Sequence, residues 1–368
     1  MSVVSGRIRE VSIISIIFII VISNVLLFYL QNITEHDLRD SLFEQQKQRQ
    51  LDSTKEISQH IGSDLSLVMS MLDGLENSIY LQQGELVSDK TKKFVQEKYN
   101  KFNAIIDRLF ILNKDDVMTL SLAPMGSDTF LGVDFSFRDW VKETKSTLSP
   151  VFSNGYERLG AYRVFITIPI LNRDTGKYIG IVGTSILTEG FFAHYGSVND
   201  INSQFLVALD RNATLLTAGV NETLVGQNFF ENYVQQFVNH NKILNNFTHS
   251  LLAGKPGYAV YDYGKGERIT TGYPILVNGK PTYFLQAIMP TAKIYTMVKD
   301  VLSIQRVQMF SVFAATSTAA IAVLIFLLRK WNIILRKEVK KRTKELEESY
   351  DDMKQYLESV LEEMKRKR

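Results

Sequence analysis

Two residues near the middle of the chain, Arg138 and Trp140, have the side chains that a binding site for a small carboxylate needs. An arginine offers a planar fork of N–H donors to a carboxylate, and a neighbouring aromatic ring excludes water and so strengthens the ion pair. Two plainer interpretations stay open. Arg138 could cap a helix or pair with Asp134 on the surface, and Trp140 could be an ordinary core residue.

The histidines and the short sequence motifs give no support for catalysis. The five histidines are not spaced as metal ligands, and the H-E-x-x-H, G-x-S-x-G and P-loop patterns are absent. The paired glutamates at 347–348 and 362–363 fit the solvated faces of a helix better than they fit receptor methylation sites. We therefore expect a protein that is not an enzyme, with no catalytic residue, no metal and no cofactor.

Two uncharged stretches, residues 11–30 and 309–328, have the length and composition of transmembrane helices. At about 1.5 Å per residue, each matches the roughly 30 Å hydrocarbon core of a bilayer. Buried core helices are the alternative. A removable signal peptide would need a shorter apolar segment and a cleavage site of small residues, and the aromatic end of the first stretch, Phe28 to Asn32, has neither.

Basic residues flank the two stretches on the same side of the membrane. Arg7 and Arg9 precede the first stretch, and seven lysines and arginines follow the second between Arg329 and Arg342. The positive-inside rule then places residues 1–10 and 329–368 in the cytoplasm and 31–308 outside, giving a two-pass plasma-membrane protein. The basic tail can contact anionic membrane lipid but gives no case for nucleic acid. The absence of cysteine favours a prokaryotic protein.

The external residues predict an α+β fold, with two PAS-like modules of antiparallel sheet on a long stalk helix from Thr34 to about Tyr80. The distal module, about residues 81–195, shows a helix at 136–145 with a serine cap and strands at 108–112, 117–121, 162–171 and 178–186. The proximal module, about residues 200–290, shows a helix at 229–244 and strands at 204–209, 214–217, 257–263, 267–274 and 282–289.

The residues after the second apolar stretch predict a coiled coil. Apolar side chains recur at spacings of three and four from Trp331 to Met364, with charges between them. Such a seam favours a parallel homodimer over a single helix lying on the membrane. In the second apolar stretch, Ala315 and Ala319 are spaced for close contact between helices, although alanines facing lipid would look the same.

Ordered fragments of the external part resemble the double Cache family of sensor domains. The segments 132–140, 150–153, 165–170 and 176–183 resemble its membrane-distal half, and 205–210, 224–227 and 257–258 its proximal half. The resemblance covers about residues 35–305, and it implies small-molecule binding in the distal module with signalling across the membrane. The tail resembles the linker that precedes the catalytic region of sensor histidine kinases, but no kinase domain follows in this sequence. We therefore expect a separate cytoplasmic kinase or other effector as the partner.

The resemblance also bears on the ligand. Double Cache domains that bind amino acids have a pattern whose arginine, tryptophan and later tyrosine match Arg138, Trp140 and Tyr156. The sequence departs from that pattern at three positions, where Val141 replaces a tyrosine and Arg158 and Ser185 replace two aspartates. A ligand ammonium needs those carboxylates, and the only substitutes nearby are Asp134, Asp139 and Glu157. We therefore expect an anionic or neutral ligand, such as a small carboxylate, rather than an α-amino acid.

Tyr162 and Arg163, on the next predicted strand, are further candidates for ligand binding, although strand alternation predicts that one of them faces solvent. Together these features predict a dimeric receptor that binds a small extracellular solute and signals through the coiled coil. Two alternatives come from other classes of protein. One is a membrane-anchored scaffold or adhesion subunit without a ligand, and the other is an ectoenzyme.

Overall fold

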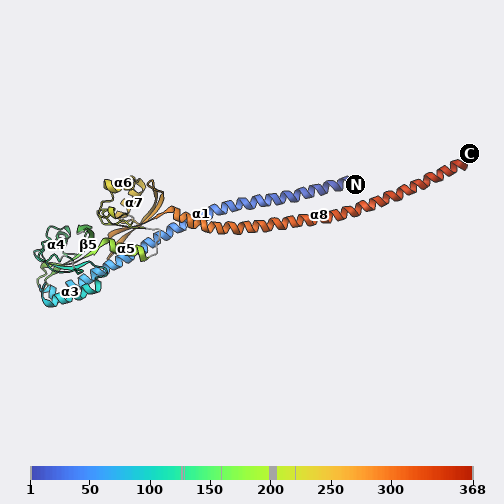
Figure 1. Ribbon diagram of the computed structural model, residues 1–368. Coiled ribbons are helices and arrows are strands. Elements are labelled where there is room, and N and C mark those ends of the chain that lie inside the picture. Colours follow the sequence, from blue (N-terminus) through green and yellow to red (C-terminus); the bar gives the residue numbers. More distant parts are fainter. Residues whose placement is uncertain are drawn as a thin grey trace. The chain divides into compact units, whose positions relative to one another are not determined.

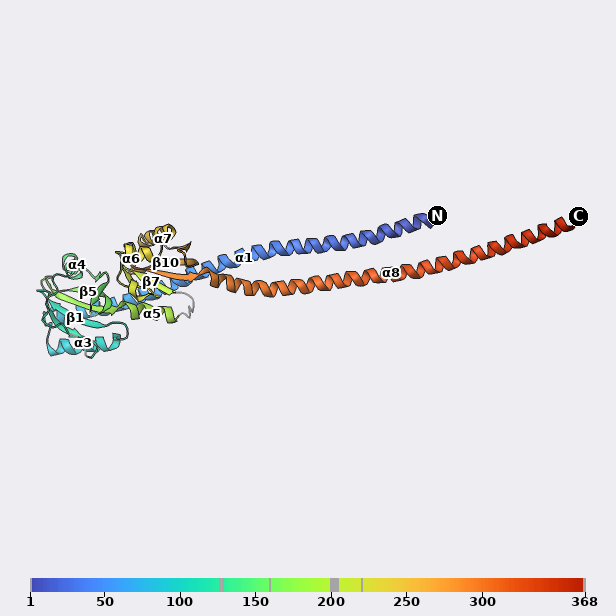
Figure 2. The ribbon, with the colours of Figure 1, turned by 45° about the horizontal axis from the view of Figure 1, so that its top comes forward.

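The computed structural model describes residues 2–125, 127, 129–158, 160–198, 205–219 and 221–366. It divides into two units, one formed by Leu42–Met297 and the other by the two ends, Met1–Ser41 and Val298–Arg368. The larger unit is an α+β structure with two antiparallel sheets, as the sequence predicts (Figures 1 and 2).

The first sheet has the strand order β2-β1-β6-β5-β3, with β4 paired beside β5. The two predicted hairpins, β1–β2 and β5–β6, are confirmed, whereas β3 and β4 are too short to show a pattern in the sequence. The strands are β1 Arg108–Asn113, β2 Met118–Leu122, β3 Val151–Phe152, β4 Tyr156–Arg158, β5 Ala161–Leu171 and β6 Tyr178–Leu187.

Helices cover both faces of the first sheet. Helix α3 (Asp89–Phe102), preceded by the short α2 (Ile79–Gln82), packs with α1 on one face, and α4 (Asp139–Thr147) packs on the other (Figure 1). Arg138 occupies the N-cap position of α4 without a capping side-chain hydrogen bond. The predicted serine cap is wrong, because the Asp134 carboxylate accepts the N–H of Ser136 and holds the chain in a turn before the helix begins.

The second sheet has the order β8-β7-β11-β10-β9. Its strands and helices are β7 Phe205–Leu209, β8 Leu215–Thr217, β9 Gly257–Asp262, β10 Glu267–Val277, β11 Lys280–Pro290, α5 Thr188–Val198, the 3-10 turn Glu222–Leu224, α6 Asn232–Phe237 and α7 Lys242–Leu252. The single helix predicted at 229–244 is wrong, because Asn239 and His240 adopt φ values of 53° and 47° and separate α6 from α7. Gln204, predicted to begin the first strand, lies outside the described residues.

Helix α1 (Ser2–Glu76) confirms the long predicted helix, and its last part lies along both sheets (Figure 2). Three buried polar residues at four-residue spacing face the second sheet. The Gln50 amide donates to Ala287 O at 3.0 Å, the Thr54 hydroxyl lies 2.6 Å from that of Thr271, and Ser58 donates to Pro274 O at 2.7 Å. This polar row, Gln50, Thr54 and Ser58, fixes the register of the stalk helix on strands β10 and β11.

The two sheet modules also contact each other directly. The buried hydroxyl of Tyr283 donates to Ser153 O at 2.9 Å, and the N–H of Gly155 donates to the Asp210 carboxylate at 3.0 Å. Both acceptors are met by donors from the opposite module, so neither module can move away without leaving a buried polar group unpaired.

Helix α8 (Thr291–Arg366) begins directly after β11. Helices α1 and α8 each contain a stretch long and apolar enough to cross a membrane, and the described residues of both stretches are not buried within the chain. That exposure argues against buried core helices. Within the unit formed by the two ends, Ser317 donates to the side-chain oxygen of Asn24 at 3.1 Å, and Arg306 pairs with Glu35.

Candidate ligand-binding site

A small cavity lies in the distal module between the first sheet and helix α4. Its volume is about 20 Å³, which is room for a water molecule or two. Six apolar or aromatic side chains, three arginines and one serine line it. The cavity is therefore nearly closed by its own side chains, and three cationic groups reach it.

Strand register brings the polar lining together. Arg108 on β1 pairs directly with Ser185 on β6, and Ser185 pairs in turn with Phe165 on β5. Arg163 precedes Phe165 by two residues, and it lies on the same face because side chains alternate along a strand. Arg108 and Ser185 are only 7% and 1% exposed, so these polar groups are held inside the module.

The lining is cationic. One of its three guanidinium groups is neutralised, since Arg163 Nε lies 2.8 Å from Asp107 Oδ2, and the Ser185 hydroxyl supports that carboxylate at 3.3 Å. Arg108 Nη1 donates to the Ser121 hydroxyl at 2.6 Å, which satisfies a donor without removing the charge. The lining thus brings three guanidinium groups together, and one of them pairs with a carboxylate.

Phe130 lies between two of these cations. Its ring centroid is 3.5 Å from the guanidinium carbon of Arg158 and 4.5 Å from that of Arg108. The ring face attracts both cations and offsets part of their mutual repulsion. Phe130 also has a φ of 56°, a left-handed conformation that a bulky residue rarely adopts. The ring thus lies against both arginines in a strained backbone conformation.

Trp140 lines the same cavity and has a buried hydrogen-bond donor. Its indole is buried and stacks on Phe165, with centroids 4.9 Å apart and an interplanar angle of 13°. The indole N–H has no hydrogen-bond partner among the described atoms. A buried donor left unpaired costs free energy that an acceptor on a ligand would recover. Trp140 thus lines the cavity, and its role in ligand binding stays a prediction.

The other residues predicted from the pattern lie outside this cavity. Arg138 is half-buried, with its guanidinium carbon 4.9 Å from the ring of Phe137 and 5.5 Å from that of Tyr156. Tyr156 packs edge-on against Phe165, and burial raises the pKa of its hydroxyl, with the nearby Asp139 carboxylate adding to the effect.

Asp134 is exposed, and hydrogen bonds from the backbone N–H and hydroxyl of Ser136 lower the pKa of its carboxyl group. Among the described residues, no ion pair joins it to Arg138. The alternative surface pair of Arg138 with Asp134 is therefore not formed, whereas ligand binding by Arg138, Asp134 and Tyr156 stays a prediction.

Tyr162 and Arg163 point to different surroundings. Arg163 lines the cavity, whereas the ring of Tyr162 packs against Gly226 in the proximal module, where an added Cβ would lie 1.7 Å from Tyr162 Cζ. Both residues are half-buried. The expectation that one of them faces solvent is wrong, because the proximal module covers that face of β5.

Sequence reasoning missed Arg108, Arg158 and Ser185 as candidates for binding. In the sequence, Arg158 and Ser185 stand out only as departures from the amino-acid-binding pattern, where each replaces a carboxylate. Arg108 gives one local signal, since it opens a strand in which the next four residues are apolar. A buried arginine at such a place needs partners, and here they come from β2 and the loop that holds Phe130.

The comparisons with known proteins bear on the fold. No protein-family model matches the sequence, and no curated protein is significantly similar to it. Solved structures are similar. The extracellular domain assigned to a histidine kinase is 11% identical, with a TM-score of 0.52 over 67% of this chain and 98% of that one.

Two ligand-binding domains of Pseudomonas aeruginosa amino acid chemoreceptors give similar values. PctB in complex with L-arginine is 14% identical, with a TM-score of 0.51 over 68% of this chain and 98% of that one. PctC in complex with GABA is 12% identical, with a TM-score of 0.50 over 66% and 99%. These neighbours are sensory, ligand-binding domains rather than catalytic ones.

Proposed function

We propose, from the double Cache sensor fold of Leu42–Met297, that this chain is a transmembrane sensor for a small extracellular carboxylate. The observation that carries the proposal is the cavity beneath α4, which is lined by three arginines and by Trp140, whose indole N–H has no partner among the described atoms. Arginine forks and a buried N–H are donors to carboxylate oxygens, and none of them can accept a hydrogen bond.

The same lining disfavours an α-amino acid. An ammonium group needs carboxylates or carbonyls around it, and the described lining offers cations instead. Arg158 and Ser185 occupy this lining where the amino-acid-binding pattern has aspartates. A compact organic acid without an amino group fits the charge of the site, and it would enter by displacing the ring of Phe130 from between Arg108 and Arg158.

Signalling follows from how the modules are connected. Contacts from the distal module to the proximal one pass through Tyr283 and Asp210, and the polar row of α1 rests on β10 and β11. Strand β11 continues into α8 without a linker. A ligand that binds one arrangement of the modules more tightly than another would therefore shift α8 relative to the stalk part of α1.

The membrane arrangement belongs to the same proposal. Residues 11–30 and 309–328 span the plasma membrane, residues 31–308 lie outside, and residues 1–10 and 329–368 lie in the cytoplasm. The distal module is about 81–195 and the proximal module about 200–290. The tail forms a dimeric coiled coil that passes the signal to a separate kinase or other effector. The positive-inside rule and the apolar stretches of α1 and α8 support this arrangement.

Thermal unfolding of the full-length chain in detergent tests the ligand class. Acetate, pyruvate, succinate and citrate are compared with neutral amides, amines and amino acids. At about 100 times its Kd, a ligand stabilises by about 2.7 kcal/mol, which for a domain of this size is about 5–10 °C. We expect a carboxylate to give this shift and the Arg158→Gln chain to lose it. A shift given only by amines, or one that survives in the Arg158→Gln chain, would contradict the proposed site.

The closed cavity favours one other function. With about 20 Å³ of space, the distal module could serve as a rigid part of a membrane-anchored scaffold or adhesion subunit that takes no ligand. The same melting series separates the two functions. No shift with any compound, in both the wild-type and the Arg158→Gln chain, supports the scaffold.

A further inference from the structure

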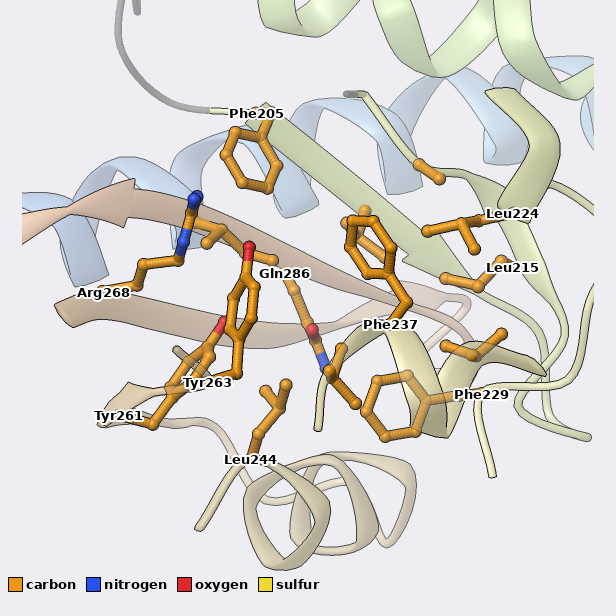
Figure 3. Close-up of a pocket in the computed structure, with 15 residues that line it drawn as sticks. Phe205, Leu215, Leu224, Phe229, Phe237, Leu244, Tyr261, Tyr263, Arg268 and Gln286 are labelled. Atoms are coloured by element: carbon orange, nitrogen blue, oxygen red, sulfur yellow. The ribbon is translucent and has the colours of Figure 1, made fainter. Parts of the chain in front are cut away.

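A second cavity lies in the proximal module, between the outer face of the second sheet and helices α6 and α7 (Figure 3). Its volume is about 60 Å³, three times that of the distal cavity. Most of the side chains around it are apolar, contributed by β7, β8, β11 and both helices. The apolar lining of the interior therefore suits an aliphatic group.

One end of this cavity is polar. Figure 3 shows Arg268, Tyr261 and Tyr263 on one side of the space, Phe229 and Phe237 on the other, and Gln286 between them. The Gln286 amide nitrogen already donates to the Thr248 hydroxyl at 3.2 Å. The charged group at the polar end is thus the guanidinium of Arg268.

Among the described residues, the guanidinium of Arg268 lies near two aromatic rings. Its central carbon lies 5.0 Å from the ring centroid of Tyr263 and 5.7 Å from that of Phe205. Its Nε–H is buried and has no hydrogen-bond partner in the described part of the chain, where no carboxylate lies within ion-pair distance of this arginine. A buried charged donor left unpaired is costly, and an anionic ligand would remove that cost.

We propose that this proximal cavity is a second ligand site, which takes a short-chain monocarboxylate. The carboxylate pairs with Arg268, and the alkyl chain enters the apolar interior between the sheet and α6 and α7. The size follows from the volume: a cavity of about 150 Å³ accepts benzene, so about 60 Å³ limits the ligand to roughly two to four carbons.

The two sites differ in what they would select. The distal lining has three guanidinium groups around a small space, which suits a compact and highly charged acid, whereas the proximal cavity has one guanidinium beside an apolar interior. The proximal site is also close in sequence to the output helix. Gln286 and Ile288 line it from β11, and α8 begins at Thr291. A ligand in the proximal site would therefore contact β11, the same strand through which ligand binding in the distal module is proposed to reach α8.

Isothermal titration of the full-length chain in detergent with sodium acetate, propionate and butyrate tests the proposal. Each added methylene that becomes buried should tighten binding about fourfold. Butyramide, the neutral isostere, should bind at least tenfold more weakly than butyrate, and Arg268→Gln should weaken butyrate binding by about 10- to 150-fold. In an Arg158→Gln background, Arg268→Gln should weaken butyrate binding by the same factor, which separates this site from the distal one.

A filled cavity gives a second, independent variant. Ala218 lines the cavity and is buried, so Ala218→Leu takes up its space while Arg268 keeps its charge. We expect this variant to melt as a folded chain and to bind acetate better than butyrate. Three results would overturn the proposal: no heat with any of the three acids, equal binding of butyrate and butyramide, or butyrate binding that survives both Arg268→Gln and Ala218→Leu.

Discussion

The contact between Tyr162 and Gly226 can be tested by one added methyl group. Gly226 has a φ of 82°, and a Cβ at this position would lie 1.7 Å from Cζ and 1.8 Å from the hydroxyl oxygen of Tyr162. Such an approach is far below van der Waals contact, so in Gly226→Ala either the ring or the turn must move. Because Tyr162 belongs to the distal module and Gly226 to the proximal one, the change tests how the modules pack.

Gly226→Ala should lower the free energy of unfolding for two reasons. A left-handed conformation costs an L-residue about 1–2 kcal/mol, and forcing an extra carbon into a packed contact costs about 1–3 kcal/mol more. Gly84 supplies the matched control, because it has nearly the same φ of 84° but no atom within 4 Å of the added Cβ. Gly84→Ala should therefore lower the free energy of unfolding only by the cost of the left-handed conformation.

Thermal unfolding of the full-length variants measures the difference. At about 2–4 °C for each kcal/mol, Gly226→Ala should melt about 2–12 °C below Gly84→Ala. Tyr162→Ala removes the ring, so in that background Gly226→Ala should cost no more than Gly84→Ala does in the wild type. Equal melting temperatures for Gly226→Ala and Gly84→Ala in the wild-type background would refute the assigned contact between the modules.

Two other predictions concern the distal site and the module interface. Arg158→Gln should weaken carboxylate binding by about 10- to 150-fold in calorimetry, whereas Arg138→Gln, outside the cavity, should change it less than twofold. A larger loss of affinity in Arg138→Gln than in Arg158→Gln would instead assign the ligand to Arg138. Burial raises the pKa of Tyr283 above its ordinary value, so stability is complete below about pH 10 and falls as pH rises further. Tyr283→Phe should cost about 1 kcal/mol at pH 7 and show a shallower loss above pH 10 in denaturant titrations; an equally steep loss would contradict the burial of that hydroxyl.

The sequence predicts the fold better than it predicts the site. The long hairpins are visible because β5 and β6 are apolar runs joined by a strong turn, Asn172 to Lys177. The strands β3 and β4 have too few residues for any period to appear. The sequence predicts one continuous helix at 229–244 because nothing in the residues around Asn239 indicates that its φ is positive.

The site depends on contacts between distant segments. Arg138 and Trp140 look like a pair in the sequence, but residues two apart at the start of a helix do not face the same way. Only Trp140 reaches the cavity. The pairing of Arg108 with Ser185 requires the register of β1 on β6, which no short motif encodes. The expectation of an anionic ligand rests on two absent aspartates, and it stays a prediction.

Fluorescence of Trp140 tests the central claim most directly. The chain has two tryptophans, so Trp331→Phe leaves Trp140, in the wall of the distal cavity, as the single reporter. Titration of this full-length variant with acetate, pyruvate, succinate and citrate should give, for at least one acid, a saturable change in emission that Arg158→Gln abolishes. Emission that stays constant with every acid, or that changes equally with and without Arg158, would contradict a carboxylate site in the distal module.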